Sequence, residues 1–558
     1  AVKQEFLIYG IEFPFIAVLA QAENHGISFN TEKWMANVKR QTEAKEVLLN
    51  ELDDLIRHYR DTFKDIDRDL LVGGKWDKKR IRSSFYDAVN KNGTIDIPNL
   101  FGEQSSIIDL FRKGKSNKVV KKSQAPAEYE GSLKYTKGEL LYILGALKQP
   151  AIRVDDTMGI PTLRKDKQVV TNPNEFSAKD DLIQRYLILK PNSPVKDLLI
   201  KYNKLQKLSK SIDTYGKAFI DKINPITGMI HTIYRQADAD TGRMQSGGGL
   251  RESSKFNSQN MPRDKNYREP FEARKGKLFD TRDYSGAELK VMVALAQDFD
   301  LLKLDATDMH STLATNSWRN IYKHRANTYY NVLSKSELME FSDVEEYQKL
   351  YDDAIKNSIN FTVTKTEPEG FRQAFKPMGF GIIYGMYPKK AGFTLNISTQ
   401  EGSIVINTVK GMIPKTIAFV EAQSEFAYKK GYVIFNTRTN SRRYFPALID
   451  RLKGKINENT NFIDISEAKS AARNATIQGT QADFVKEASV KLAYYYWKNN
   501  IDAITLLWIH DELVCEIEES IAEEVSKKKT EIMIDVANKY LRNVSIEVEG
   551  HLLPYWTK

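Results

Sequence analysis

A mostly apolar run near the C-terminus contains three polar residues whose types could do chemistry. The run reads AITLLWIHDELVCEIEE over 503–519, with His510, Asp511 and Glu512 between two β-prone segments. This pattern predicts two strands joined by a tight turn. Charged side chains are rarely fully buried unless they are paired or bound to a metal. The turn is therefore either a surface turn whose carboxylates face water or a site whose carboxylates face a cation.

A further carboxylate stands at the end of another predicted strand. In FDTRDYSGAELK (279–290), Asp283 lies where the strand gives way to a helix. If both strands belong to one sheet, Asp283 and Asp511 come close together, and close carboxylates raise each other's pKa unless a cation lies between them. Mg²⁺ prefers a few carboxylates together with phosphate oxygens of a substrate. The pair therefore points to a two-metal site for phosphoryl transfer.

A third stretch supplies positive charge and aromatic rings. GFRQAFKPMGFGIIYGMYPKK (370–390) has one such side chain every four residues: Arg372, Lys376, Phe380 and Tyr384. On a helix these four form one stripe, and two cations followed by two rings suit a triphosphate followed by a base and sugar. Pro377 is expected to distort the helix. An ordinary amphipathic helix has the same spacing, so the stripe by itself leaves both interpretations open.

Composition limits the class of protein that carries these stretches. A chain of 558 residues is too long for one hydrophobic core, so two to four structural units are expected. The net charge of +10 suits a polyanionic partner without requiring one. The single cysteine, Cys515, excludes an internal disulfide framework and a multi-cysteine zinc site, and indicates a reducing, cytoplasmic setting.

Several longer segments must position these residues. Helical periodicity is expected over 31–72, 181–220 and 466–500, and a hairpin over 223–236. Residues 110–138 are strongly basic and poorly periodic, which fits a solvated insertion or a surface for a phosphate backbone or partner protein.

The N-terminal apolar stretch FPFIAVLA (13–20) is too short for a membrane span and lacks a cleavage-site pattern. We therefore expect no membrane partner.

The three chemical stretches resemble, in order and spacing, motifs A, B and C of family A DNA polymerases, the DNA polymerase I family. They stand here as DYSGAELK (283–290), RQAFKPMGFGIIYG (372–385) and HDE (510–512). Six more segments are similar to that family: IEFPFIAVLAQAENHGISFN (11–30), INPITGMIH (223–231), TGRMQS (241–246), NSQNMP (257–262), DMHS (308–311) and RNATIQGTQAD (473–483).

The resemblance implies an α+β right-hand polymerase fold, with an antiparallel sheet in the palm and mostly helical fingers and thumb. It divides the chain into a palm lead-in (1–32), a thumb with the basic insertion (33–222), a palm segment with motif A (223–285), fingers with motif B and an insertion near 311–371 (286–498), and a palm segment with motif C (499–558).

The function implied is template-directed addition of dNTPs to a primer 3′-OH by two-metal-ion phosphoryl transfer, with release of pyrophosphate. The expected cofactors are two Mg²⁺ ions, for which Mn²⁺ can substitute, and the expected partners are primer–template DNA and dNTPs. A replicative role in the cytoplasm of a bacterium or a phage-infected cell is expected. By analogy with phage relatives, the insertion within the thumb is expected to bind a processivity partner.

The resemblance also assigns roles to the residues at the reaction centre. Asp283 and Asp511 would bind metal, and the Tyr284 carbonyl would complete one ion's shell. Glu512 would be an accessory carboxylate near the primer end. His510 would contact the primer strand.

Motif B and its neighbours would bind the incoming nucleotide. Lys376 would contact the α-phosphate side and protonate the leaving pyrophosphate, while Arg372 and His310 would hold the outer phosphates. Phe380 would pack on the nucleotide. Glu288, supported by Tyr384, would crowd the 2′ position and exclude ribonucleotides.

Residues along the primer–template minor groove complete the implied site: Arg243, Asn257, Gln259, Asn260, Asn474 and Gln478. Acceptor positions in that groove are nearly independent of sequence, as copying any template requires.

Some positions depart from the family pattern. Motif A has Gly286 and Ala287 where many members have Gln and Ile, and Lys290 replaces Arg, which resembles the phage-replicative branch. Ser470 stands where the family usually has a minor-groove arginine. The polymerase-like segment begins by about residue 11, so no 3′→5′ proofreading activity is expected of this chain.

Two alternatives compete with a DNA polymerase. A single-subunit RNA polymerase or a reverse transcriptase would share the motifs, although Glu288 argues against ribonucleotide use. A catalytically silent primer–template-binding protein would have no reason to retain Asp283, Asp511 and Lys376 together.

Overall fold

The computed structural model describes residues 2–62, 71–72, 75–76, 183, 187, 193–236, 238–247, 256–306, 308–334, 341–366, 370–395, 397–458 and 460–557. The chain forms two compact units. Unit 1 comprises Ala1–Asn37, Lys217–Tyr387 and Ser403–Lys558, and unit 2 comprises Val38–Gly216 and Pro388–Gly402. The basic stretch 110–138, with the partner site predicted on it, lies outside the described residues.

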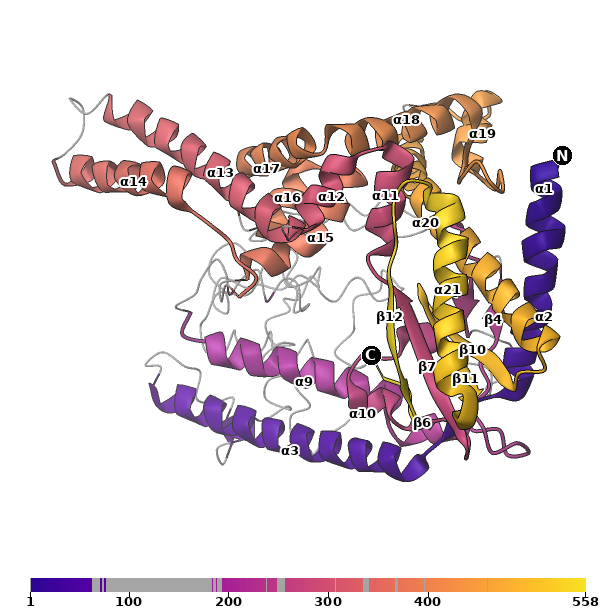
Figure 1. Cartoon of the computed structure of the whole chain (residues 1–558). Helices are drawn as coiled ribbons and strands as arrows, with labels where there is room; N and C mark the ends of the chain where they lie inside the picture. The colour runs from indigo at the N-terminus through magenta and orange to yellow at the C-terminus, as the bar shows by residue number, and fades with distance from the viewer. Residues whose placement is uncertain are drawn as a thin grey trace. The chain divides into compact units, whose positions relative to one another are not determined.

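Unit 1 is built on a four-stranded antiparallel sheet with the order β10-β11-β7-β12 (Figure 1). The strands are β7 (Lys277–Tyr284), β10 (Ala503–Ile509), β11 (Glu512–Glu518) and β12 (Val548–Leu553). β10 and β11 are the predicted hairpin around 503–519. Because β7 pairs with β11 on one side and β12 on the other, its register is fixed along both edges.

Long helices cover this sheet, which explains why β10 and β11 are buried along nearly their whole length. They are α2 (Phe13–His25), α20 (Phe462–Lys498) and α21 (Ala522–Leu541), while the shorter α11 (Ala287–Ala296) follows β7 and packs on α20 and α21. α21 packs on β7, β11 and β12, and α2 packs on β10 and α20. Trp508 lies at the centre, with edge contacts to Phe15 at 5.8 Å and Tyr234 at 5.0 Å between ring centroids. α20 confirms the helix predicted over 466–500.

A buried polar cluster ties the sheet to α21. The Lys529 amine donates hydrogen bonds to the backbone oxygens of Asp280 (2.7 Å) and Leu513 (2.9 Å) and lies 3.4 Å from the Asp280 carboxylate. Arg282 Nε and the Ser526 hydroxyl donate to the same carboxylate at 2.8 and 2.9 Å. The cluster therefore joins β7, β11 and α21 just behind the ends of the strands that carry motifs A and C.

A second group of helices in unit 1 carries motif B: α12 (Phe299–Ala306), α13 (Met309–Leu333), α14 (Phe341–Asn360), α15 (Phe371–Ile383), α17 (Thr399–Met412, which begins in unit 2) and α18 (Pro414–Lys430). The insertion expected near 311–371 forms α13 and α14, which lie side by side (Figure 1). α15 also packs on α13 and continues through Pro377. A Cβ atom added to Gly379 would lie 3.3 Å from the Leu313 side chain. The lack of a side chain at Gly379 therefore permits the close approach of α15 to α13.

Shorter elements complete unit 1: α1 (Val2–Leu7), a π-helix (Ile8–Glu12), β1 (Ser28–Phe29), β4 (Tyr234–Arg235), β5 (Gln245–Ser246), α10 (Lys265–Arg268), β6 (Phe271–Glu272), β8 (Tyr432–Ile434), β9 (Arg442–Tyr444), α19 (Pro446–Leu452) and three 3₁₀ turns at Lys217–Lys222, Ser258–Asn260 and Glu519–Ile521. Of the hairpin predicted over 223–236, the structure contains the turn, which is closed by the Ile223–Ile230 bridge and by a 2.8 Å hydrogen bond from the Asn224 amide to the Met229 carbonyl. The pairing does not continue beyond the turn, because β4 pairs with β5 instead.

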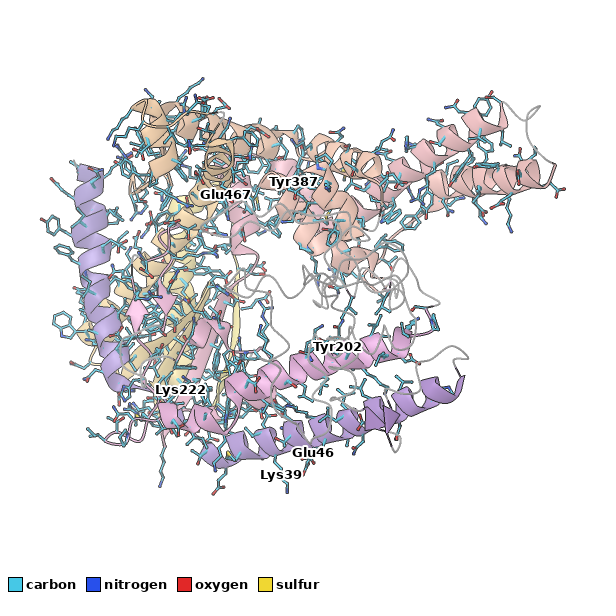
Figure 2. All side chains as sticks on the ribbon, turned by 180° about the vertical axis from the view of Figure 1, so that it is seen from behind. Lys39, Glu46, Tyr202, Lys222, Tyr387 and Glu467 are labelled. Carbon is cyan, nitrogen blue, oxygen red and sulfur yellow. The ribbon has the colours of Figure 1, made fainter. Side chains whose placement is uncertain are left out.

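In unit 2, the described elements are α3 (Thr31–Thr62, which begins in unit 1), α9 (Lys196–Tyr215), α16 (Pro388–Leu395) and the paired β2 (Leu71–Val72) and β3 (Lys75–Trp76). Tyr202 on α9 is fully buried, whereas Lys39 and Glu46 are exposed on α3 (Figure 2). The helix predicted over 31–72 is confirmed over Thr31–Thr62, whereas Leu71–Val72 form a strand, and α9 confirms the helix predicted over 181–220 for Lys196–Tyr215.

Among the described residues, the helical run Val2–His25 has the length and apolar composition to cross a membrane. Core helices and signal sequences have the same properties, and Phe15, Val18 and Leu19 of this run are buried. The bent pair α17 and α18 qualifies only if helices meeting at 102° are counted as one span.

Candidate active site

The sheet brings motif A and motif C together. In the register of β7 and β11, Asp283 lies directly opposite Glu512, and Asp511 is the neighbouring residue in the turn. Ile509 pairs with Glu512, so His510 and Asp511 form a two-residue turn in which His510 is left-handed (φ 62°). Left-handed residues suit such tight hairpins. The two predicted metal-binding carboxylates therefore stand near each other, one at the end of β7 and one in the turn that leads into the adjacent β11.

Tyr284 anchors the end of β7 with its side chain. Its ring is buried, and its hydroxyl donates a 3.0 Å hydrogen bond to the Met533 carbonyl on α21. Burial, followed by the charges of Glu487 and Asp511, raises the pKa of Tyr284 well above its usual value. The hydroxyl thus stays protonated, and the backbone at Asp283 is held in place.

Glu512 lies in a closed cluster rather than at the surface. Its side chain is 1% exposed, and Trp556 Nε1 donates a 3.1 Å hydrogen bond to its Oε1. The Arg268 guanidinium stacks on the Trp556 ring at 4.3 Å, with Nη1 3.7 Å from the same carboxylate oxygen. Burial lowers the pKa of Arg268, and the charges of Glu512 and Asp283 oppose that shift. Arg268 and Trp556 were missed in the sequence because neither lies in a motif segment.

The donor atoms around Asp283 and Asp511 fit a hard divalent cation. Two carboxylates and the Tyr284 backbone oxygen are all oxygen donors, and Mg²⁺ takes few protein ligands because it also binds water and substrate phosphates. Within the described ranges, no group of three or more His, Cys, Asp or Glu side chains is placed to enclose a metal.

The sugar-discriminating pair predicted from motifs A and B is in contact. Tyr384, at the end of α15, donates a short hydrogen bond from its hydroxyl to the Glu288 carboxylate on α11. Burial and the Glu288 charge raise the pKa of Tyr384 well above its usual value, so the phenol remains a donor. Gly286 precedes α11 in a left-handed conformation (φ 61°), which positions the first turn that carries Glu288.

The stripe on α15 is helical, as expected. Lys376 is exposed, Phe380 is half-buried, and the Phe380 ring lies 6.5 Å from the ring of His310 on α13. Arg372 is largely enclosed and forms a two-bond ion pair with Asp308, which precedes α13. Asp308 was missed as a site residue, although it stands within the DMHS segment two positions before His310.

The predicted minor-groove residues fall into two groups. Asn257, Gln259 and Asn260 lie in the 3₁₀ turn beside β10, where Asn257 Oδ1 accepts from the backbone amides of the other two. Gln259 Nε2 donates to the Met244 and Trp508 carbonyls at 3.1 and 3.2 Å. These side chains shape the turn, and their DNA contacts stay a prediction.

The second group belongs to α20. Asn474 and Gln478 lie on that helix, and Arg243 donates to Gln481 one turn further along. Ser470, found in place of the family arginine, donates a 2.9 Å hydrogen bond to the Tyr384 carbonyl. It therefore joins α20 to the end of α15, while Lys469 and Arg473 pair with Glu425 and Glu421.

The sequence of this chain is similar to sequences of known proteins. The model of the family described as "DNA polymerase family A" matches residues 154–327 and 339–558. The chain is 26% identical to DNA polymerase I of Geobacillus stearothermophilus over 416 residues, which cover 73% of this chain and 39% of that protein. It is 28% identical to thermostable DNA polymerase I of Thermus aquaticus over 408 residues, which cover 72% and 40%. The chain thus spans about two fifths of the length of these relatives.

Among solved structures, the POL domain of Pol1 from M. smegmatis, in complex with DNA primer-template and dNTP, matches with a TM-score of 0.56 at 20% identity. The match covers 98% of this chain and 70% of that chain. It establishes the α+β polymerase fold. Because the family model matches more than half of its residues, the chain belongs to DNA polymerase family A.

Proposed function

We propose that the chain is a template-directed DNA polymerase that adds dNTPs to a primer 3′-OH and releases pyrophosphate. The observation that carries the proposal is the register of β7 and β11, which places Asp283 beside the His510–Asp511 turn. Family A membership and the stripe on α15 support it. Primer–template DNA and dNTPs are the proposed partners.

The chain's own residues then have distinct tasks. Asp283, Asp511 and the Tyr284 carbonyl would hold two divalent ions, Mg²⁺ or in its place Mn²⁺. When bound, such ions activate the attacking hydroxyl and stabilise charge on the leaving oxygen. Lys376 and Arg372 orient the triphosphate by charge-assisted hydrogen bonds, and Lys376 supplies a proton to the pyrophosphate.

Nucleotide selection is assigned to Glu288 and Tyr384. Because the Tyr384 hydroxyl holds the Glu288 carboxylate, the carboxylate has a fixed position, which would lie beside the sugar of a bound nucleotide. The 2′-OH of a ribonucleotide would then lie against the Glu288 carboxylate, which is already hydrogen-bonded to Tyr384. This supports deoxyribonucleotides over ribonucleotides as substrates and disfavours the RNA polymerase alternative.

We propose the palm, fingers and thumb divisions as they follow from the motifs: palm at 1–32, 223–285 and 499–558, fingers at 286–498 and thumb at 33–222.

Replicative use in a cytoplasm and a processivity partner at the basic insertion are part of the same proposal. Comparing partner capture and processivity with and without residues 85–150 tests the partner, and unchanged results would reject it.

Primer extension on the full chain tests the activity. The wild type should extend a primer with Mg²⁺ and dNTPs but not with NTPs, and a chelator should stop it. Asp283→Ala and Asp511→Ala should each abolish extension, since each removes a metal-binding carboxylate. Asp300→Ala is the matched control, because Asp300 is an exposed carboxylate on α12 paired with Lys303. Extension that survives both site substitutions would refute the assignment.

A further inference from the structure

Asp308 is the residue from which the inference starts. It precedes α13 in a left-handed conformation (φ 64°, ψ 82°), and its side chain is 8% exposed. Asp and Asn adopt this region more readily than other residues with a Cβ. The Ser311 hydroxyl donates a 2.7 Å hydrogen bond to Asp308 Oδ2. The carboxylate is therefore fixed from its own helix.

The same carboxylate fixes Arg372. Arg372 Nε donates to Asp308 Oδ2 at 2.7 Å, and Nη2 donates to Oδ1 at 3.1 Å. Two parallel bonds hold the plane of the guanidinium as well as its distance. Since the Nε/Nη2 edge faces Asp308, the direction of the Nη1 edge is also set.

This ion pair is a crosslink between two parts of the nucleotide site. Asp308 lies two residues before His310, and Arg372 lies one turn before Lys376 on α15. The whole α13–α14 insertion separates Asp308 from Arg372 in sequence, so no short connection holds them in register. The ion pair adds a specific restraint to the packing of α13 on α15, at the point where both helices begin.

We propose that Asp308 is a positioning residue for nucleotide binding, which orients Arg372 toward the phosphates of the incoming nucleotide. The inference rests on the proposed polymerase function. Asp308 itself would not touch the nucleotide. Its loss should weaken nucleotide binding more than it slows the chemical step, because the metal-binding carboxylates and Lys376 are not its partners.

Single-nucleotide incorporation at saturating primer–template tests this on the full chain. Asn and Gly, introduced by Asp308→Asn and Asp308→Gly, both tolerate the left-handed backbone at this position. Both substitutions remove the charged carboxylate that accepts two hydrogen bonds from Arg372. Each should raise the KM for dNTP about tenfold, equivalent to about 1.4 kcal/mol, with kcat changed less than about threefold. The Kd for primer–template should stay the same. Asp300→Asn makes the same change at the exposed pair with Lys303 and should leave KM unchanged.

A double-mutant cycle shows whether Asp308 acts through Arg372. In an Arg372→Ala background, adding Asp308→Asn should raise KM no further. An equal further rise would overturn the inference, as would an unchanged KM in both single variants. A lower KM would also overturn it, because Asp308 would then compete with the phosphates. If the wild type extends no primer, the proposed function fails instead.

Discussion

Beside the His510–Asp511 turn, a hydrogen bond from Trp556 holds the Glu512 carboxylate in a buried setting. Glu512 is enclosed by Trp556 and Arg268, so its carboxylate has a fixed position directly beside Asp511. When a buried hydrogen-bond acceptor loses its donor, the protein loses more stability than the hydrogen bond itself had contributed. The geometry at Asp511 therefore depends on a tryptophan close to the C-terminus.

Substituting Trp556→Phe removes the Nε1–H donor and retains an aromatic ring for Arg268. We expect kcat for incorporation to fall about tenfold, because a small displacement of a reacting group is costly. The free energy of unfolding should fall by about 1–3 kcal/mol. Trp497→Phe on α20 is the control, since Trp497 is exposed. Equal effects of the two substitutions in incorporation and melting assays would contradict this role.

The sequence predicted the candidate catalytic and nucleotide-binding residues, because they stand in recognisable short motifs. It did not predict the residues that hold those side chains in position. Asp283, Asp511 and the α15 stripe stand in short patterns that determine a position on a strand or helix. Trp556 and Arg268 reach Glu512 only through the tertiary fold. Asp308 contacts Arg372 across an insertion, so no local pattern links the two.

At the scale of elements, α20 contains Gly479, a residue with low helix propensity whose small size allows close packing. Gly479 lies against the Phe435 ring, and an added Cβ would come within 2.2 Å of that ring. The glycine therefore lets α20 approach the segment after β8. Helix propensity alone would predict the opposite preference.

Gly479→Ala should destabilise the protein by about 1–3 kcal/mol through overpacking, despite the better helix propensity of alanine. Gly411→Ala in α17 is the matched control, because no atom outside its helix lies within 4 Å of the added Cβ. That control should be stabilising by up to about 1 kcal/mol. Denaturant unfolding measures both, and a stabilising Gly479→Ala would show that Phe435 moves freely.

Periodicity identified the long helices but not every pairing partner. α20 and the β10–β11 hairpin are where the sequence placed them. The hairpin expected over 223–236 is instead a bridged turn followed by β4, whose partner β5 lies beyond the next loop. The Pro and Gly residues correctly predicted a chain reversal, but β4 pairs with β5, which lies outside residues 223–236.

At the scale of unit 1, distant segments are joined by the buried cluster around Asp280 and Lys529. Both side chains are fully buried, and Lys529 also binds the Leu513 carbonyl. Removing one member of a buried ion pair leaves an uncompensated charge. The cluster is therefore expected to control the stability of the whole sheet.

Lys529→Met should lower the free energy of unfolding by about 3–5 kcal/mol. The neighbouring Lys528→Met should have little effect, because Lys528 pairs with Glu531 at the surface. Chemical denaturation followed by tryptophan fluorescence, which reports on buried Trp508, measures the difference. Indistinguishable unfolding curves would show that Arg282 and Ser526 alone satisfy Asp280.

Because β7 is paired on both sides, the places where the chain can accept inserted residues are limited. A single residue added within 277–282 would turn every following side chain of the strand to the other face of the sheet, Asp283 included. Both neighbouring strands would then have to shift or lose their pairing. We therefore expect added residues to be tolerated between α13 and α14, and the length of the strand that carries Asp283 to be fixed by its pairing on both sides.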